Sequence, residues 1–456
     1  MPSRVLSIRG VHLPYTDGEL ARKRFTVICV DDKVDSIVEF EAESVDEVSS
    51  EEDIEQEVIH VEEPCLLLPS FCHAHIHLDK CFLLSTGKCD ELVTGDFEEA
   101  LQVTAKAKSS FRDNREDLLE RGRRLIVESV ECGVSGMRAH VEVDDIVDMT
   151  CLSVGLQLKE EMKSVCDIQV AAFAQDPLFL RESVNPGRNY SLLAQACAEY
   201  PIQAVGSAPY VEATIEDAKK NIALLFDLAC KYKIHLDFHL DYNVDPHSEP
   251  MIWEVVNILL DKKQKNQWAA EKCVCIGHAT RLTLFSDEEW TKLSNIIRGN
   301  DLPISFVGLP QSDMYMMGRG REIPIRTTLN IPKLSSKYQL PFAMSVNNVD
   351  NAFTPQGSMD PLSLCTLGVA LFHTCTVVDC ACMLQSISTI ARYAIGMESS
   401  SRTLVPTSND TANFVLLHGV QKISSAARSS PSFERTTVFQ GRKVAERIGR
   451  KWFTLN

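Results

Sequence analysis

The sequence predicts an α/β fold: a (β/α)8 barrel of the TIM type with a small β-sandwich domain built from both chain ends. Two observations favour this fold. From about residue 65, apolar runs of strand length alternate with longer segments of helical periodicity. Near both ends of the chain, short apolar runs alternate instead with turn and acidic segments, a pattern typical of antiparallel strands.

The repeating part contains eight apolar runs that we expect to be barrel strands. They cover residues 65–77, 135–143, 167–173, 203–208, 234–241, 273–278, 303–307 and 341–346. Most are separated by segments with helical periodicity, such as residues 114–133, 214–232 and 286–299, and each of these begins with a polar residue that can cap a first turn. Eight strand and helix units of this kind close a barrel.

Three segments follow from this pattern. We expect residues 1–64 to form the first part of the β-sandwich, residues 65–398 the metal-dependent barrel, and residues 399–456 the second part of the sandwich. Each terminal segment is too short to bury a core alone, so the two ends should share one.

The charge balance narrows the class of partner. The chain carries 63 acidic and 46 basic side chains, a formal net charge of -17, which repels phosphate backbones and anionic membrane surfaces. No apolar run reaches the roughly 18 residues that span a bilayer, and the first residues lack the apolar core of a signal peptide. We therefore expect a cytoplasmic protein with a small-molecule substrate and neither nucleic acid nor membrane as partner. The sequence leaves open whether the chain forms a homo-oligomer.

Histidines cluster at the expected strand ends. His73, His75 and His77 lie on one face of the first strand, and two of them are close enough along it to chelate one ion. Further histidines fall near later strands, at His140, His235, His239 and His278. Because the carboxyl ends of barrel strands carry the chemistry, this pattern predicts a metal centre there.

Such a centre suits hydrolysis of a carbon–nitrogen bond. A metal held by neutral imidazoles keeps its positive charge and lowers the pKa of a bound water. A nearby group must then move the water's proton to the departing nitrogen, and His278 and Asp241 are the candidates. We expect one divalent ion, zinc first, with iron and manganese also compatible with histidine ligands.

Six motifs stand at or near the ends of the expected strands: PSFCHAHIHLDK, GVSGMRAHVEVD, VAAFAQDPLF, LDFHLDYNVDP, IGHATRL and MSVNNVDNAFTPQG. Together they resemble the amidohydrolase superfamily, in its branch of cytosine deaminase and N-isopropylammelide isopropylaminohydrolase. The resemblance runs over nearly the whole chain and implies a small cyclic nitrogen compound as substrate.

The same resemblance implies roles for individual residues. It makes His75, His77 and His239 the metal ligands, and it places His278 beside the reacting carbon. It implies contacts with the substrate from Gln175, Arg138 and His140. Arg138 has a second interpretation, in which it holds a carboxylate such as Glu142 or Asp144.

Two positions depart from the family pattern. Asn347 stands where the family has an aspartate that binds the metal and accepts the water's proton, and an amide brings no charge and no base. Tyr242 stands where the deaminases have a glutamate, and a phenol has a pKa of about 10. Three interpretations stay open: hydrolysis with a substitute base (His278, Asp241 or Asp350), a non-hydrolytic reaction with Tyr242 as acid, or a protein without catalysis.

The segment 310–320 follows the seventh predicted strand and offers Asp313 and Arg319 as further contacts to a substrate. Its run of methionines is equally typical of packing. Asp79 and Lys80, just after the histidine pair, are interpreted as structural partners of neighbouring loops.

Overall fold

The computed structural model describes residues 3–16, 18–41, 54–180, 183–320, 322, 324–397, 402–429 and 434–449. The predicted limit of the barrel at residue 398 falls outside these ranges, as does most of the acidic segment at residues 43–57. Among the described residues, no helix has both the length and the apolar character needed to cross a bilayer.

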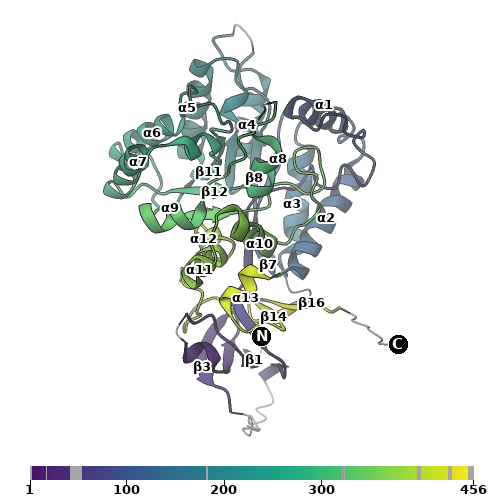
Figure 1. The fold of residues 1–456 in the computed structure, drawn as a ribbon. Coiled ribbons are helices and arrows are strands. Elements are labelled where there is room, and N and C mark those ends of the chain that lie inside the picture. The colour runs from purple at the N-terminus through teal and green to yellow at the C-terminus, as the bar shows by residue number, and fades with distance from the viewer. Residues whose placement is uncertain are drawn as a thin grey trace.

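Eight parallel strands form the barrel, which confirms the predicted fold class (Figure 1). In chain order they are β6 (Phe71–His77), β7 (Val134–Glu142), β8 (Asp167–Ala174), β9 (Ala204–Ser207), β10 (His235–Leu240), β11 (Val274–His278), β12 (Ile304–Gly308) and β13 (Phe342–Met344). Each pairs with its sequence neighbour. The ring closes just past β13, where the Asn347 N–H donates to His75 O at 3.1 Å and the His77 N–H donates to Asn347 O at 2.8 Å.

Helices surround this barrel and connect its strands. They are α1 (Phe97–Lys108), α2 (Arg115–Glu131), α3 (Thr150–Met162), α4 (Arg188–Glu199), α5 (Ile215–Tyr232), α6 (Ile252–Gln264), α7 (Asp287–Gly299), α8 (Pro310–Met316), α9 (Ile331–Tyr338), α10 (Leu362–Leu371), α11 (Val377–Ser386) and α12 (Thr389–Ala394). The described residues also form three short 3-10 helices, η1 (Leu20–Arg22), η2 (Pro209–Val211) and η3 (Thr280–Leu284). Two of the three predicted caps form, at α5, where Thr214 accepts from Asp217 N, and at α7, where Ser286 and Glu289 make a capping box. The Asn114 side chain makes no such bond at the start of α2.

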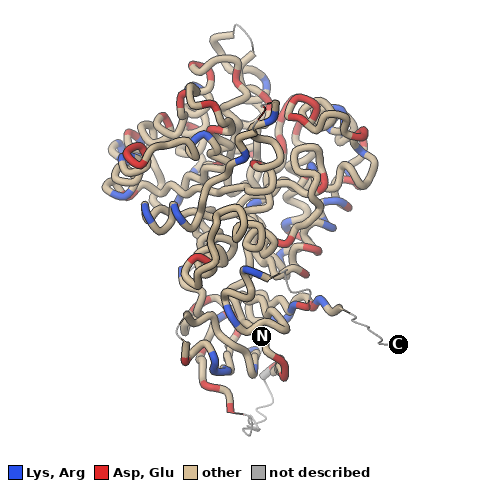
Figure 2. Tube along the Cα trace, viewed as in Figure 1, with Lys and Arg blue, Asp and Glu red and all other residues tan. Residues whose placement is uncertain are grey.

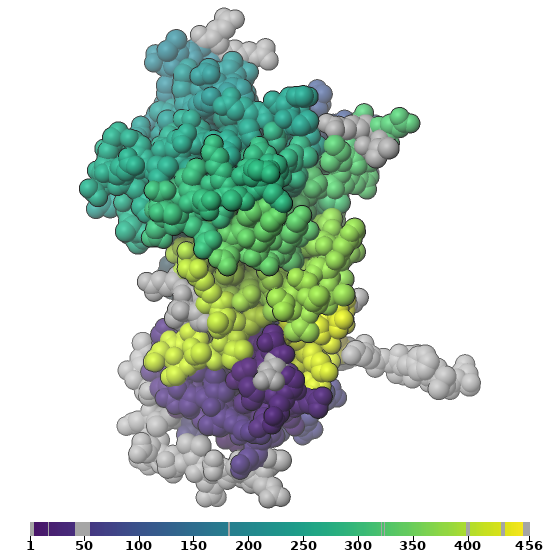
Figure 3. Space-filling view, turned by 60° about the vertical axis from the view of Figure 1, so that its left-hand side comes forward, coloured from purple at the N-terminus to yellow at the C-terminus, as the bar shows by residue number. Residues whose placement is uncertain are grey.

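The two chain ends build the small domain from two four-stranded sheets. One sheet has the order β3 (Lys33–Glu39), β2 (Phe25–Val30), β1 (Ser3–Val11), β4 (Ile54–His60). The other has the order β16 (Arg442–Arg447), β15 (Arg435–Phe439), β14 (Phe414–His418), β5 (Cys65–Pro69), and α13 (Ile423–Arg428) lies between β14 and β15 in the chain. Figure 3 shows the purple amino-terminal residues packed directly against the yellow carboxyl-terminal ones.

Two strand predictions need correction. The expected first barrel strand, residues 65–77, is in fact two strands, because β5 pairs with β14 in the small domain and only β6 enters the barrel. Leu66 and Leu68 of β5 join the large core while Cys65 and Leu67 join the sandwich core, so both faces are buried and the sequence reads as one continuous apolar run. The amino-terminal strands are also not all antiparallel, since β4 lies parallel to β1 at the edge opposite β3.

A buried ion pair joins the two domains. Arg435 of β15 donates to both carboxylate oxygens of Asp360 at 2.8 and 2.6 Å, and also to the backbone oxygen of Cys132 at 2.6 Å. Both side chains are almost fully buried. A bidentate pair of this kind holds the sandwich in one orientation against the barrel.

We predict that Arg435→Met lowers the free energy of unfolding by about 3–5 kcal/mol, because it leaves Asp360 buried without its partner. Urea denaturation followed by circular dichroism measures the loss. Arg124→Met is the control, since Arg124 pairs with Glu128 on the exposed face of α2 and its loss should cost less than about 1 kcal/mol. Equal losses in the two variants would contradict the prediction.

Candidate active site

Three histidines meet at the carboxyl ends of β6 and β10. The Nε2 atom of His239 lies 2.9 Å from Nε2 of His75 and 3.0 Å from Nε2 of His77. His75 and His77 share one face of β6 because side chains alternate along a strand, and β10 brings His239 opposite them. All three side chains are buried.

These nitrogens fit a metal ion. Burial, with nearby positive charge, lowers the pKa of each ring well below its usual value, so each imidazole is neutral and offers a lone pair. Nitrogens that share one zinc ion with bonds of about 2.0–2.1 Å stand roughly 3.3 Å apart in a tetrahedron. Nε2 of His239 is already close to that spacing from Nε2 of His75 and of His77. Their Nδ1 atoms have no hydrogen-bond partner among the described residues.

A second possible metal-binding group shares two of these histidines. It consists of His75, His140, Asp237 and His239, whose donor atoms lie within 4.8 Å of one another. We favour the trio of His75, His77 and His239 as the metal site. Asp237 Oδ2 already accepts from Arg138 Nη1 at 3.0 Å, and Asp237 Oδ1 lies 3.2 Å from His140 Nε2 without a hydrogen bond among the described residues. Although burial opposes it, these two partners hold the pKa of Asp237 below its usual value.

Arg138 has all its donor nitrogens engaged, which leaves none free for the predicted contact with a substrate. Its side chain is fully buried under the histidines, where it donates to Asp237, to Gln169 Oε1 at 2.8 and 3.0 Å, and to Ile395 O at 2.5 Å. It holds a carboxylate, as the alternative role predicted, but that carboxylate is Asp237 rather than Glu142 or Asp144.

His278 and Asp313 form a hydrogen-bonded pair beside the trio. Asp313 Oδ1 lies 3.0 Å from His278 Nδ1, and Asp313 Oδ2 accepts from Thr328 Oγ1 at 2.6 Å. The backbone at His278 has φ +66°, a left-handed conformation that turns the side chain after the strand ends. With Asp313 accepting, the proton sits on Nδ1 and the lone pair of Nε2 is free, as a proton acceptor requires.

The two departures from the family pattern lie close together. Asn347 Nδ2 donates to Ser312 Oγ at 2.7 Å, while Asn347 Oδ1 is buried and has no partner among the described residues. The Tyr242 hydroxyl donates to Ser312 O at 3.4 Å, and its ring lies against that of His278, with centroids 3.8 Å apart and the planes tilted by 34°. Burial raises the pKa of Tyr242 well above 10, so this phenol stays protonated.

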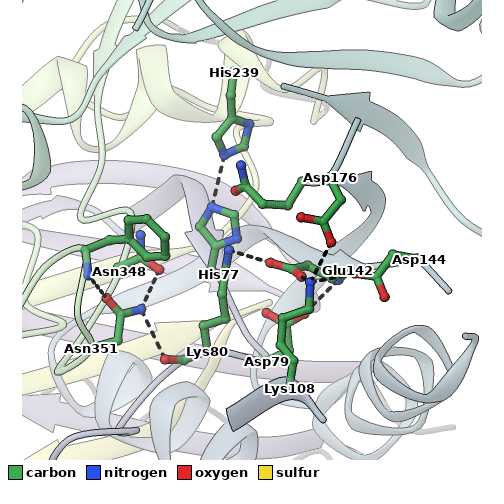
Figure 4. Close-up of polar contacts among 12 residues, drawn as sticks. His77, Asp79, Lys80, Lys108, Glu142, Asp144, Asp176, His239, Asn348 and Asn351 are labelled. Carbon is green, nitrogen blue, oxygen red and sulfur yellow. Dashed lines mark hydrogen bonds and ion pairs between the residues drawn. The ribbon is translucent and has the colours of Figure 1, made fainter. Parts of the chain in front are cut away.

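Figure 4 shows a buried charge network beside His77. Lys80 Nζ lies 2.6 Å from Glu142 Oε1, and the other Glu142 oxygen meets Lys108, which also contacts Asp144 at 2.6 Å. Asp79 accepts from the Glu142 N–H at 2.7 Å, so the sequence interpretation of Asp79 and Lys80 as structural partners agrees with these contacts. The ammonium of Lys80 helps to keep His77 neutral by lowering its pKa.

Sequence reasoning did not single out Lys108 or Asp237. Asp237 stands two residues before His239, where strand alternation puts it on the same face, and that spacing was the available signal. Lys108 lies at the end of α1, and nothing in its local sequence marks it.

Other predicted site residues lie farther from this centre or have their polar atoms engaged. Asp241 accepts from Met251 N at 2.8 Å and Ile252 N at 3.1 Å; burial raises its pKa to about 7, but both oxygens serve the start of α6. Asp350 accepts from Ser85 N at 3.2 Å. Arg319 is exposed and donates to Tyr315 O at 3.0 Å. These roles stay predictions.

His235 needs a correction of place. It opens β10 instead of ending it, so it lies at the opposite end of the barrel from the trio, with Nδ1 3.2 Å from Cys273 Sγ. His73 is buried beside Ser129 at 3.2 Å and does not join the trio either.

Aromatic rings lie at the end of the barrel that holds His75, His77 and His239. Phe97 makes edge contacts with Tyr210, Tyr242 and Phe353 at centroid distances of 6.3, 6.1 and 5.9 Å. Gln175 adds a polar group here, its Nε2 3.4 Å from the Tyr210 hydroxyl. Apolar walls with a few directed polar groups are typical of sites for small planar molecules.

No family model matches the chain. A curated relative, N-isopropylammelide isopropyl amidohydrolase from Pseudomonas sp. (strain ADP), is 29% identical over 181 residues, 38% of this chain and 42% of the relative. The matched region thus spans less than half of that relative's length.

Solved structures extend the likeness over the whole fold. The 5-methylcytosine deaminase of Klebsiella pneumoniae is 18% identical with a TM-score of 0.81, covering 98% of this chain and 100% of that one. N-isopropylammelide isopropylaminohydrolase of Burkholderia multivorans is 19% identical with a TM-score of 0.72, covering 97% and 99%. Guanine deaminase of C. acetobutylicum is 11% identical with a TM-score of 0.61, covering 97% and 100%.

We predict that the protein purified without chelator carries about one equivalent of a divalent metal, because three neutral nitrogens converge on one point. Elemental analysis measures it. His239→Gln should reduce the content at least about tenfold, since two nitrogens chelate far more weakly than three. The matched control is His73→Gln, a buried histidine of the same strand as His75. Loss of metal in the control but not in His239→Gln would refute the assignment.

Proposed function

We propose that this chain is a member of the amidohydrolase superfamily and hydrolyses a carbon–nitrogen bond of a small cyclic nitrogen compound with the help of one divalent metal ion. The observation that carries the proposal is the convergence of three neutral histidine nitrogens beside the His278–Asp313 pair. Hydrolysis needs both a site for a metal and a proton acceptor next to it.

His75, His77 and His239 would hold the metal, which when bound supplies positive charge that acidifies a water molecule and polarises the bond to be broken. Asn347 adds no charge to this site. Asp237 supports it from below, since its carboxylate contacts His140 at 3.2 Å and lies 3.7 Å from His75 Nδ1. Its negative charge thus lies close to a ligand histidine, where it favours a bound cation.

His278 takes the place of the missing aspartate and glutamate as the group that moves the proton. Its Nε2 accepts a proton from the attacking water and returns it to the departing nitrogen. Asp313 stabilises the imidazolium that forms between these two steps, because it is buried and bonded to Nδ1. Tyr242 plays no acid role in this scheme, since its hydroxyl is directed at a backbone carbonyl.

The aromatic lining and Gln175 support a planar, nitrogen-containing substrate. The named relatives also support it, since their names refer to 5-methylcytosine, guanine and N-isopropylammelide. These three compounds are the first substrates to test, with release of ammonia or amine as the readout.

We predict that His278→Gln lowers kcat by about 10²–10⁴-fold on any compound that the protein hydrolyses, because it removes the proton acceptor. Its metal content should stay at the wild-type level, which separates proton transfer from metal binding. Tyr242→Phe is the companion variant and should keep most of the activity. The assignment fails if Tyr242→Phe is the inactive variant and His278→Gln is not.

A second prediction concerns Asn347. Asn347→Asp restores a carboxylate at the strand end and should raise the hydrolytic rate by about 10²-fold or more, the scale of general base catalysis. The same variant should lose its metal to a chelator more slowly than wild type. The Ser312 hydroxyl beside it can donate to the new carboxylate. Asn348→Asp adds the same charge one residue along and should do neither. A rate lowered by Asn347→Asp would count against the hydrolytic scheme.

A further inference from the structure

A cavity lies at the end of the barrel opposite to the histidine trio. It has a volume of about 460 Å³ and is lined by the end of α3, the start of β8, the segment after α12 and loops of the small domain. It therefore sits where the amino-terminal face of the barrel meets the β-sandwich. Cavities of this size accommodate small ligands.

Positive charge dominates its wall. Four cationic side chains line it against two carboxylates; the cations are Lys33, Lys159, Lys163 and Arg392, and the acids are Asp32 and Asp167. The whole chain has the opposite balance, with a net charge of -17, and Figure 2 shows acidic and basic positions interspersed along the trace. The cavity is thus a local excess of cations in an acidic protein.

One of these cations is buried without an ion-pair partner. Arg392 is only 8% exposed, and its guanidinium donates to the hydroxyls of Ser135 at 2.6 Å and Ser70 at 3.2 Å. Within the described ranges, no carboxylate lies at ion-pair distance from Arg392, although the charge of Asp167 acts on it from the same wall. Lys159 is half-buried; burial lowers its pKa, and the charge of Asp167 opposes that shift. A buried cation whose charge is only partly compensated is costly, and an anion in the cavity reduces that cost.

The backbone leaves room for this arrangement. A Cβ atom on Gly136 would stand 2.8 Å from an Arg392 nitrogen, so glycine lets the guanidinium lie flat against β7. The fixed arginine then offers a directed, planar donor, and the lysines add mobile charge at the rim. Arginine and lysine together are typical of sites for phosphate groups.

We infer that this cavity binds a small anion of the phosphate class, either free phosphate or the phosphate group of a monoester. The site is separate from the metal centre, because its walls lie at the amino-terminal ends of the strands. Nothing in the hydrolytic scheme uses it.

The lysines are the residues to change. Arg392 holds Ser70 and Ser135, and Gln169, which also lines the cavity, holds Arg138 under the metal centre, so either substitution would disturb the fold or the active site. Lys159 in the last turn of α3 and Lys163 at its C-cap hold no other part of the core. Lys231 and Lys233 occupy the equivalent end of α5 outside the cavity and form the matched control.

The test is calorimetric titration of the full-length, metal-loaded protein with inorganic phosphate and, separately, adenosine monophosphate. Wild type should bind at one site, the Lys159→Met/Lys163→Met variant should bind about tenfold or more weakly, and Lys231→Met/Lys233→Met should match wild type. Tighter binding of the monoester identifies a phosphorylated compound as the ligand, and equal binding identifies free phosphate. No binding at millimolar phosphate, or binding that survives loss of both lysines, overturns the inference.

Discussion

Closure of the barrel between its first and last strands is the constraint on which the site depends. The backbone of Asn347 bonds to His75 and His77 on both sides, so the residue that departs from the family pattern is also the residue that seals the ring. The backbone of Asn347 has a φ of +70°, so the chain turns directly after this pair of hydrogen bonds. Closure sets the distance between β6 and the end of the eighth strand, and with it the place of the Asn347 amide relative to the two histidines.

Charge buried beneath the histidines has a related consequence. Arg138 and Asp237 form an ion pair in the centre of the barrel, and Asp237 in turn contacts His140. Such a pair needs further hydrogen bonds to offset its burial, and Gln169 and Ile395 O complete those of Arg138. This network places a fixed negative charge, Asp237, close to His75.

Much of the fold was readable from the sequence because its period is simple. Buried parallel strands give apolar runs and the surrounding helices give a period of 3.6, so all eight strands were found. The split between β5 and β6 was not readable, since both segments are buried on both faces. Asp241 looked like a proton acceptor at a strand end, yet its oxygens bond to the backbone ten and eleven residues later, which no local pattern shows.

The sequence by itself determined the barrel, the sharing of the sandwich by both chain ends, and the cluster of histidines at strand ends, because period and spacing are local properties. Spacing alone left open which histidines meet; the family resemblance selected His75, His77 and His239, and the tertiary structure brings these three together. His73 and His235 have the same residue type and similar strand context as His75 and His239, but they lie away from the trio. The reason is that strand direction and barrel closure, rather than spacing, set which side chains share a point in space.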